Sequence, residues 1–164
     1  MTEKKHIIKE FEQEFTKLKK NLGFKADFET LDKEFFLSDA ILDKGFVSKN
    51  LSSQIRGRIV EVIISMDNYL HSLIMPNPQN LFNINESKAL NDNDKKEVTK
   101  IMSRAAYFVA KNAGLRFADD KKEEGKFIDE VSNFWHNKYK PFMKKILEKI
   151  EERWKESDEK VKEK

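Results

Sequence analysis

Two residues that could do chemistry together, Asp67 and His71, lie four positions apart in the most apolar stretch of the chain. Residues four apart share one face of a helix. A carboxylate beside an imidazole can orient a general base or supply two metal ligands. Glu61, a further acid of this stretch, falls on roughly the opposite side of the helix, so no third ligand completes a metal set. The plainer interpretation is a hydrogen-bonded polar pair, either within an otherwise apolar helix or near its solvent-exposed edge.

Glu61 interrupts a segment that is expected to be buried. Buried charges are normally paired, so the default interpretation is a structural ion pair. Three arginines are candidates for its partner: Arg56, Arg58 and Arg104. Glu61, Asp67 and His71 are therefore expected to be buried polar residues, with ligand binding as the alternative.

The strongest functional signal is electrostatic and lies between Val98 and Ala118, where four basic residues occur without an acid. Spacings of four and seven put the first three on one helical face, and the fourth extends that face. Such a face suits phosphates or an acidic partner. Alternatively, it is neutralised within the fold by the acidic segment 27–43 or the acids of 119–124. The four residues are Lys100, Arg104, Lys111 and Arg116.

Composition excludes several kinds of site. The chain has no Cys, which removes thiol catalysis, thiolate metal sites and disulfides. Its 5 glycines are isolated, so no glycine-rich phosphate loop is present. We therefore expect no catalytic residues, no metal and no cofactor. A net charge of +3 is small for a generally basic nucleic-acid binder.

Helical periodicity predicts an all-α fold, a single bundle of five to six helices. Residues 3–22 carry an apolar face that Gly23 ends, and Asp27 caps a second helix that Gly45 ends. Asp94 with Glu97 resembles a capping box, and Gly114 closes that helix. One helical turn is expected at 86–90. Asp119 or Asp120 begins the last helical region, in which Pro141 either starts a sixth helix or kinks a long fifth one.

The segment of about 50–75 is apolar on almost all sides, between a cap at Ser48 or Asn50 and Pro76. A helix of this kind is normally buried on most sides, so it is predicted to be the centre of the bundle. Gly57 within it could permit a close approach of another helix. The most apolar part of this segment, from Ile59 to Met75, contains Glu61 and Asp67 and spans only 17 residues, so it is too short and too charged to cross a membrane.

These patterns predict one helical domain over residues 1–155 and a charged, frayed tail over 156–164. The absence of Cys and of an apolar N-terminal run favours a cytoplasmic protein. The function expected first is a non-enzymatic interaction module that binds a protein partner or its own copy. One alternative is a nucleic-acid-binding accessory subunit that uses the basic face. A second is a metal-binding or hydrolytic bundle built on Asp67 and His71.

Overall fold

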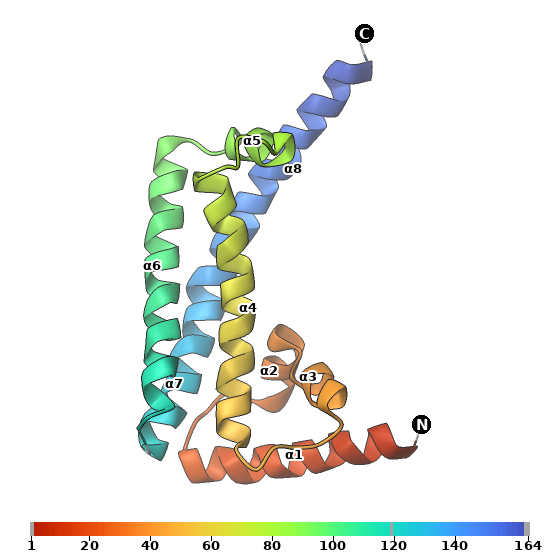
Figure 1. The fold of residues 1–164 in the computed structure, drawn as a ribbon, viewed down its shortest axis with the longest axis vertical. Coiled ribbons are helices and arrows are strands. Elements are labelled where there is room, and N and C mark those ends of the chain that lie inside the picture. The colour runs from red at the N-terminus through yellow and green to blue at the C-terminus, as the bar shows by residue number, and fades with distance from the viewer. Residues whose placement is uncertain (1, 119, 163–164) are drawn as a thin grey trace. The chain divides into compact units, whose positions relative to one another are not determined.

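The computed structural model describes the backbone of residues 2–118 and 120–162, and over this part of the chain it is helical without strands (Figure 1). The helices are α1 (Thr2–Leu22), α2 (Phe28–Phe35), α3 (Leu37–Lys44), α4 (Leu51–Ile74), α5 (Leu81–Ser87), α6 (Asp92–Leu115), α7 (Lys121–Phe134) and α8 (Lys140–Lys162), with a π-helical segment η1 (Trp135–Tyr139). The predicted all-α class is confirmed. The number of helices is approximately right when α7, η1 and α8 are taken as one.

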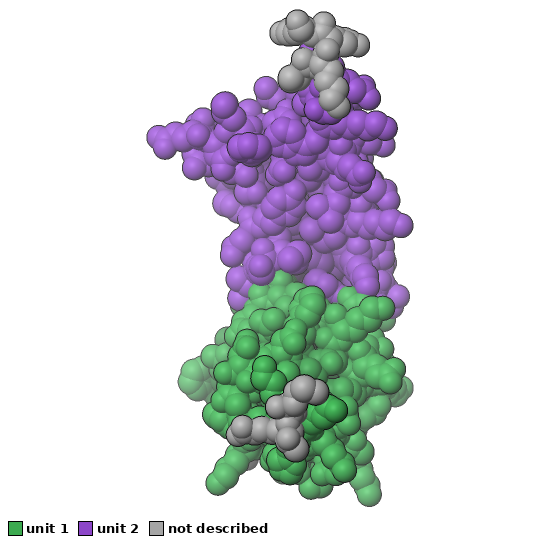
Figure 2. Space-filling view, turned by 90° about the vertical axis from the view of Figure 1, so that its right-hand side faces the viewer, with its two compact units in different colours: residues 1–63, 107–133 green, residues 64–106, 134–164 purple. Residues whose placement is uncertain are grey.

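The chain forms two compact units, coloured separately in Figure 2. The first unit comprises residues 1–63 and 107–133, and the second comprises residues 64–106 and 134–164. Helices α4 and α6 each contribute to both. The single domain over 1–155 stays a prediction, and α8 continues as far as Lys162, into the predicted tail.

Local signals end and begin the helices of the first unit largely as predicted. Gly23 and Gly45 have positive φ of 71° and 74°, the left-handed conformation that glycine adopts at least cost. The Asp27 carboxylate accepts from the Thr30 backbone N–H, which caps α2. The carbonyl of Asn50 accepts from the N–H of Gln54 in the first turn of α4.

The predicted second helix breaks at Phe36, whose φ is 53°, so residues 28–44 form two helices rather than one. Phe35 and Leu37 are both buried. Two residues apart, they would point to nearly opposite sides of a continuous helix. The break lets both reach the core, and the Asp32 carboxylate stabilises it by accepting from the backbone N–H of Ser38 at 2.6 Å.

In α4, the prediction of burial on nearly all sides is wrong for one stripe. The buried positions include Ile55, Ile59 and Ile63 in the first unit and Leu70 and Leu73 in the second. The exposed positions recur at the helical period and are Glu61, Ile64, Ser65, Asn68 and His71.

The start of α6 and the position of α5 also differ from the prediction. Asn91 and Asp94 each accept a hydrogen bond from the other's backbone N–H, so the reciprocal cap lies three residues before the predicted pair of Asp94 and Glu97. Helix α5 occupies 81–87 rather than 86–90, because Asn80 accepts from the N–H groups of Phe82 and Asn83.

The chain stays helical through Pro141. The π-helical segment η1 leads directly into α8, so Pro141 does not start a separate helix. The N–H of Lys140 donates to the carbonyl of Trp135, five residues earlier. Proline has no N–H to donate, so a normal helical ladder would be interrupted at this point. The wider π turn just before it accommodates the change. Asp120 accepts from the N–H of Glu123 at the start of α7, while Asp119 lies outside the described residues.

Within residues 2–118 and 120–162, no helix is long and apolar enough to span a bilayer.

Candidate anion-binding site

The first unit contains a buried arginine, Arg56, of which 2% is exposed. Helix α4 places Ser52 one turn before it. Helices α6 and α7 bring Asn112 and Glu124 to the same point. A fully buried arginine is rare unless it is paired, so its partners decide what it does.

The partners of Arg56 satisfy its hydrogen bonds better than they neutralise its charge. Its Nη1 donates to Asn112 Oδ1 at 2.7 Å, and its Nε donates to Ser52 Oγ at 3.4 Å. The Glu124 carboxylate lies 3.6 Å from Nη2, which makes an ion pair without close contact. The same carboxylate accepts a hydrogen bond from the Ser52 hydroxyl, so it is shared between two donors.

A second arginine, Arg116, adds positive charge near this group. Burial lowers the pKa of Arg56, and the nearby Arg116 guanidinium lowers it further, while Glu124 opposes both. Arg116 is exposed at the end of α6, where its N–H donates to the carbonyl of Ala113. Among the described residues of this group, two guanidinium groups therefore face one carboxylate, that of Glu124.

These groups line an open cavity of about 490 Å³. Its polar lining includes Asn50 and Ser53 beside the two arginines and Glu124. Its apolar lining includes Phe117, which is 93% exposed. The cavity thus combines arginine donors, hydroxyl and amide groups, and an exposed aromatic ring.

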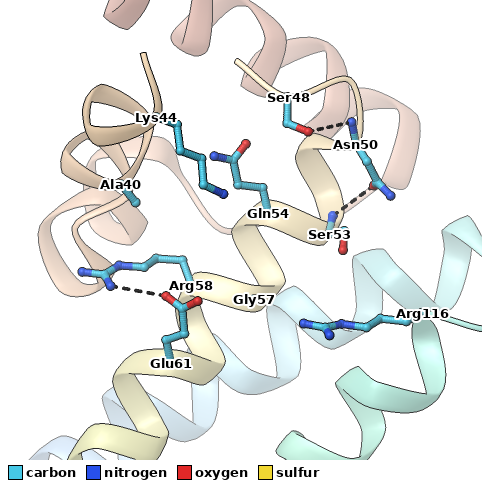
Figure 3. A pocket seen from close by; sticks show the side chains of 10 residues that line it. All are labelled: Ala40, Lys44, Ser48, Asn50, Ser53, Gln54, Gly57, Arg58, Glu61 and Arg116. Atoms are coloured by element: carbon cyan, nitrogen blue, oxygen red, sulfur yellow. Dashed lines mark hydrogen bonds and ion pairs between the residues drawn. The ribbon is translucent and has the colours of Figure 1, made fainter. Parts of the chain in front are cut away.

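A second cavity, of about 340 Å³, shares Asn50, Ser53 and Arg116 with the first. In Figure 3 the Arg116 side chain extends from the end of α6 toward Gly57 on α4. A Cβ at Gly57 would meet no atom within 4 Å, so the predicted close approach of a helix does not occur there.

The other side of this cavity adds two more cations, Lys44 and Arg58. The Arg58 Nε donates to the carbonyl of Phe35 at 2.9 Å, and its Nη1 lies 3.4 Å from a carboxylate oxygen of Glu61. Both amide atoms of Gln54 are buried without a hydrogen-bond partner, and its side chain points toward Lys44 (Figure 3). An unsatisfied buried amide is costly, and it marks this cavity as a place where polar groups are incompletely paired.

This arrangement is suited to binding anions. Guanidinium groups donate to phosphate or carboxylate oxygens in a fixed fork geometry. No cluster of three or more His, Asp or Glu residues able to hold a metal ion occurs within the described part of the chain.

The four residues of the predicted basic face are divided between the two units. They also differ in the acids with which they form ion pairs. In the second unit, Lys100 donates to Glu97 at 2.6 Å and is otherwise exposed, and Arg104 is exposed as well. In the first unit, Lys111 is neutralised by two carboxylates of α7, of which Glu123 belongs to the predicted acidic segment 119–124 and the nearer one, Glu130, does not. Its Nζ lies 2.8 Å from Glu130 and 3.8 Å from Glu123.

The hydrogen bond from Lys111 to Glu130 is the main cause that raises the pKa of Lys111. Lys111 is therefore held as a charged partner of two carboxylates. Of the four predicted residues, Arg116 is the one that lines the two cavities.

The expected burial of Glu61 and His71 is wrong, because both lie on the exposed stripe of α4. Glu61 pairs with Arg58, one of the three predicted candidates, as a surface pair. Asp67 is half-buried and accepts a hydrogen bond from the Tyr139 hydroxyl at 2.6 Å. Burial raises the pKa of Asp67, and this hydrogen bond partly opposes the effect.

Most of this site is not predicted from the sequence. Arg56 is expected only as a candidate partner of Glu61, whereas the structure pairs it with Glu124. No sequence pattern points to a role for Asn112 or Phe117. One signal could have led to Arg56: it occupies the same helical stripe as Ser52 and Ile59, a face that is buried. The chain matches no protein-family model, no curated protein and no solved structure, so the site rests on its own geometry.

Proposed function

We propose that this protein is a non-enzymatic binding module and that its first unit binds the phosphate groups of a nucleic acid. The observation that carries the proposal is the cavity in which, among the described lining residues, the buried Arg56 and the exposed Arg116 stand against one carboxylate, that of Glu124. A phosphate oxygen would supply the negative charge that this pair of guanidinium groups lacks.

The extent of the basic lining favours a polymer over a small anion. Lys44 and Arg58 continue the positive charge from Arg116 into the adjoining cavity, where Glu61 is the acid. A nucleic-acid backbone repeats a negative charge at short intervals, so one strand can engage several such cations. The hydroxyl and amide groups of Ser53 and Asn50 are further typical phosphate contacts.

The test is fluorescence anisotropy with labelled RNA and DNA oligonucleotides, first at about 50 mM salt and then over a salt series. Arg116→Ala should weaken binding about tenfold, the value of one charge-assisted hydrogen bond, and lower the salt slope by about one. Lys33→Ala is the matched control, because Lys33 is an exposed cation of the same unit that lines neither cavity. It should change affinity less than twofold, or about 0.4 kcal/mol.

Equal losses in the two variants would mean that only net charge matters, and the proposed site would then be wrong. No binding of either nucleic acid to the unmodified protein at low salt would contradict the function itself.

A second candidate function, docking of a protein partner or a second copy, is favoured by the second unit. There the large apolar residues Met75, Leu81 and Phe82 are 67%, 78% and 69% exposed. Exposed apolar residues that are close in the chain suit protein contacts. Light scattering of the protein and of Leu81→Glu tests this candidate. If both proteins have the molar mass of a monomer, with and without added nucleic acid, self-association is contradicted.

A further inference from the structure

We propose that Phe117 is a stacking platform for an unpaired base, so that the nucleic acid bound by the first unit is single-stranded. This inference rests on the proposed function and deepens it by naming the class of nucleic acid. It is carried by the position of an almost fully exposed phenyl ring in the wall of the cavity that holds Arg56 and Arg116.

The exposure of Phe117 is unusual within this chain. Its 93% compares with 51% for Phe36, 59% for Phe46 and 69% for Phe82, whereas Phe108 and Phe127 are completely buried. The ring of Phe82 also packs against Trp154 at a centroid distance of 5.5 Å. Within the described part of the chain, no ring contact involves Phe117.

Local backbone geometry holds Phe117 in this exposed position. Beyond the last residue of α6, the N–H groups of Phe117 and Ala118 both donate to the carbonyl of Gly114, at 3.0 and 3.2 Å. These bonds continue the turn past the end of the helix, so residue 117 is fixed by the backbone while its side chain remains in water. An exposed phenyl ring gains no burial from this arrangement, which leaves its apolar face available to a ligand.

The neighbouring residue supplies the complementary chemistry. Arg116 and Phe117 are consecutive, with Cα atoms about 3.8 Å apart, and both line the cavity. A nucleotide likewise presents an anionic phosphate and a flat base joined by one sugar. Arginine contacts to the phosphate and stacking of the base on an aromatic ring are the two interactions by which proteins hold single strands.

Stacking on Phe117 requires a base with an uncovered face. In a duplex, both faces of each internal base are covered by its neighbours, whereas a single strand can present a base to the ring. The geometry therefore predicts a preference for single strands over duplexes that depends on the phenyl ring.

The experiment compares Phe117→Ala with Phe117→Tyr, which keeps an aromatic ring, in anisotropy titrations with a single-stranded RNA of about 10 nucleotides and its blunt duplex. Phe117→Ala should weaken single-strand binding about tenfold and leave duplex binding within about twofold, while Phe117→Tyr should bind like the unmodified protein. Phe46→Ala is the matched control, because Phe46 is 59% exposed in the same unit and lines neither cavity.

A strand that carries 2-aminopurine gives a second, direct measurement. Its fluorescence should be quenched on binding to the unmodified protein and to Phe117→Tyr, and less so on binding to Phe117→Ala. Circular dichroism melts should be the same for all three proteins, because the replaced ring is exposed.

Two results would overturn the inference and leave the proposed function in place: equal affinity for single strands and duplexes, or unchanged single-strand binding in Phe117→Ala while Arg116→Ala still weakens it. If Phe117→Ala instead abolishes self-association in light scattering without affecting strand binding, the ring is a protein contact. If the unmodified protein binds no nucleic acid, the proposed function fails together with this inference.

Discussion

Among the residues whose burial the structure describes, each unit buries one charged side chain to the same extent, and the two units compensate that charge differently. Arg56 in the first unit and Asp94 in the second are both 2% exposed. A buried charge is tolerated when nearby groups replace the water that it loses. If the surrounding groups fully neutralise the buried charge, the residue is structural. If they neutralise it only in part, the residue can still bind a ligand of opposite charge.

Asp94 is more than compensated. It lies 2.6 Å from the Lys149 ammonium and 3.6 Å from that of Lys145, and it accepts from the N–H of Asn91. Burial alone would raise the pKa of Asp94, but the hydrogen bonds from Lys149 and Asn91 and the two ammonium charges together lower it. Asp94 thus joins the start of α6 to α8 and has little capacity for another ligand.

Arg56 is compensated by fewer charges. One carboxylate, that of Glu124, serves Arg56 and also accepts from Ser52, while Arg116 adds a second positive charge. Burial with incomplete neutralisation, next to an open cavity, distinguishes this site from the one at Asp94. The first unit therefore holds the incompletely neutralised buried charge, which supports the proposal that its cavity binds an anion.

The largest effect should follow from Arg56→Ala. The change removes a large buried side chain, the cation that pairs with Glu124 and the donor to Asn112, so the free energy of unfolding should fall by about 3–5 kcal/mol. Urea denaturation measures the loss. Arg56→Met fills most of the volume without the charge and should recover part of the stability but none of the nucleic-acid binding. If Arg56→Met binds as well as the unmodified protein, Arg56 is structural in the same sense as Asp94.

A smaller loss, about 2 kcal/mol, should follow from Asp94→Asn, which weakens a helix cap and removes the carboxylate between two lysines. Lys145 and Lys149 are 53% and 31% exposed at their side chains, so water can solvate them after the change. Urea denaturation again gives the value, and nucleic-acid affinity should remain the same. A tenfold change in affinity would remove the distinction between the two units.

The same residue predicts a pH dependence. Because folding lowers the pKa of Asp94, its contribution to stability is complete above the ordinary value of 3.8 and is lost as the pH falls through the lowered pKa. Acid should therefore destabilise the unmodified protein more steeply below about pH 4 than it destabilises Asp94→Asn. Thermal melts over a pH series test this, and parallel curves for the two proteins would contradict it.

Glu124→Gln should have opposite effects on stability and binding. Removing the carboxylate near Arg56 should lower the free energy of unfolding by about 1 kcal/mol and strengthen nucleic-acid binding about threefold, because the cavity becomes more positive. Glu123→Gln is the matched control: Glu123 is the preceding residue of α7 and pairs with Lys126 and Lys111. Anisotropy that shows weaker binding in Glu124→Gln would mean that Glu124 positions Arg56 more than it competes with the ligand.

The smallest effect is expected from Lys100→Ala in the second unit. Lys100 is 72% exposed and pairs with Glu97 three residues away, a surface pair worth a few tenths of a kcal/mol. Stability should change by less than about 0.5 kcal/mol and affinity by less than about twofold. A loss in anisotropy titrations equal to that of Arg116→Ala would extend the binding surface into the second unit.

Several helix ends could be predicted because their causes lie within a few residues. Gly23 and Gly45 adopt positive φ, and Asp27 accepts from Thr30, as the sequence pattern indicates. The break at Phe36 could not be predicted in this way, since burial of both Phe35 and Leu37 depends on what surrounds them. The glycines give a similar contrast: Gly57 lies in open space, whereas a Cβ at Gly125 in α7 would collide with the carbonyl of Leu22.

By itself, then, the sequence determined the all-helical class, several helix boundaries and the acid-free basic stretch of 98–118, because periodicity, caps and local charge act over one or two turns. The tertiary structure decided that Arg56 meets Asn112 and Glu124, that Lys111 is neutralised, and that Arg116 and Phe117 line one cavity. The physical reason is that charge compensation depends on distances between side chains on different helices. Residues far apart in the chain set those distances, and no local pattern encodes them.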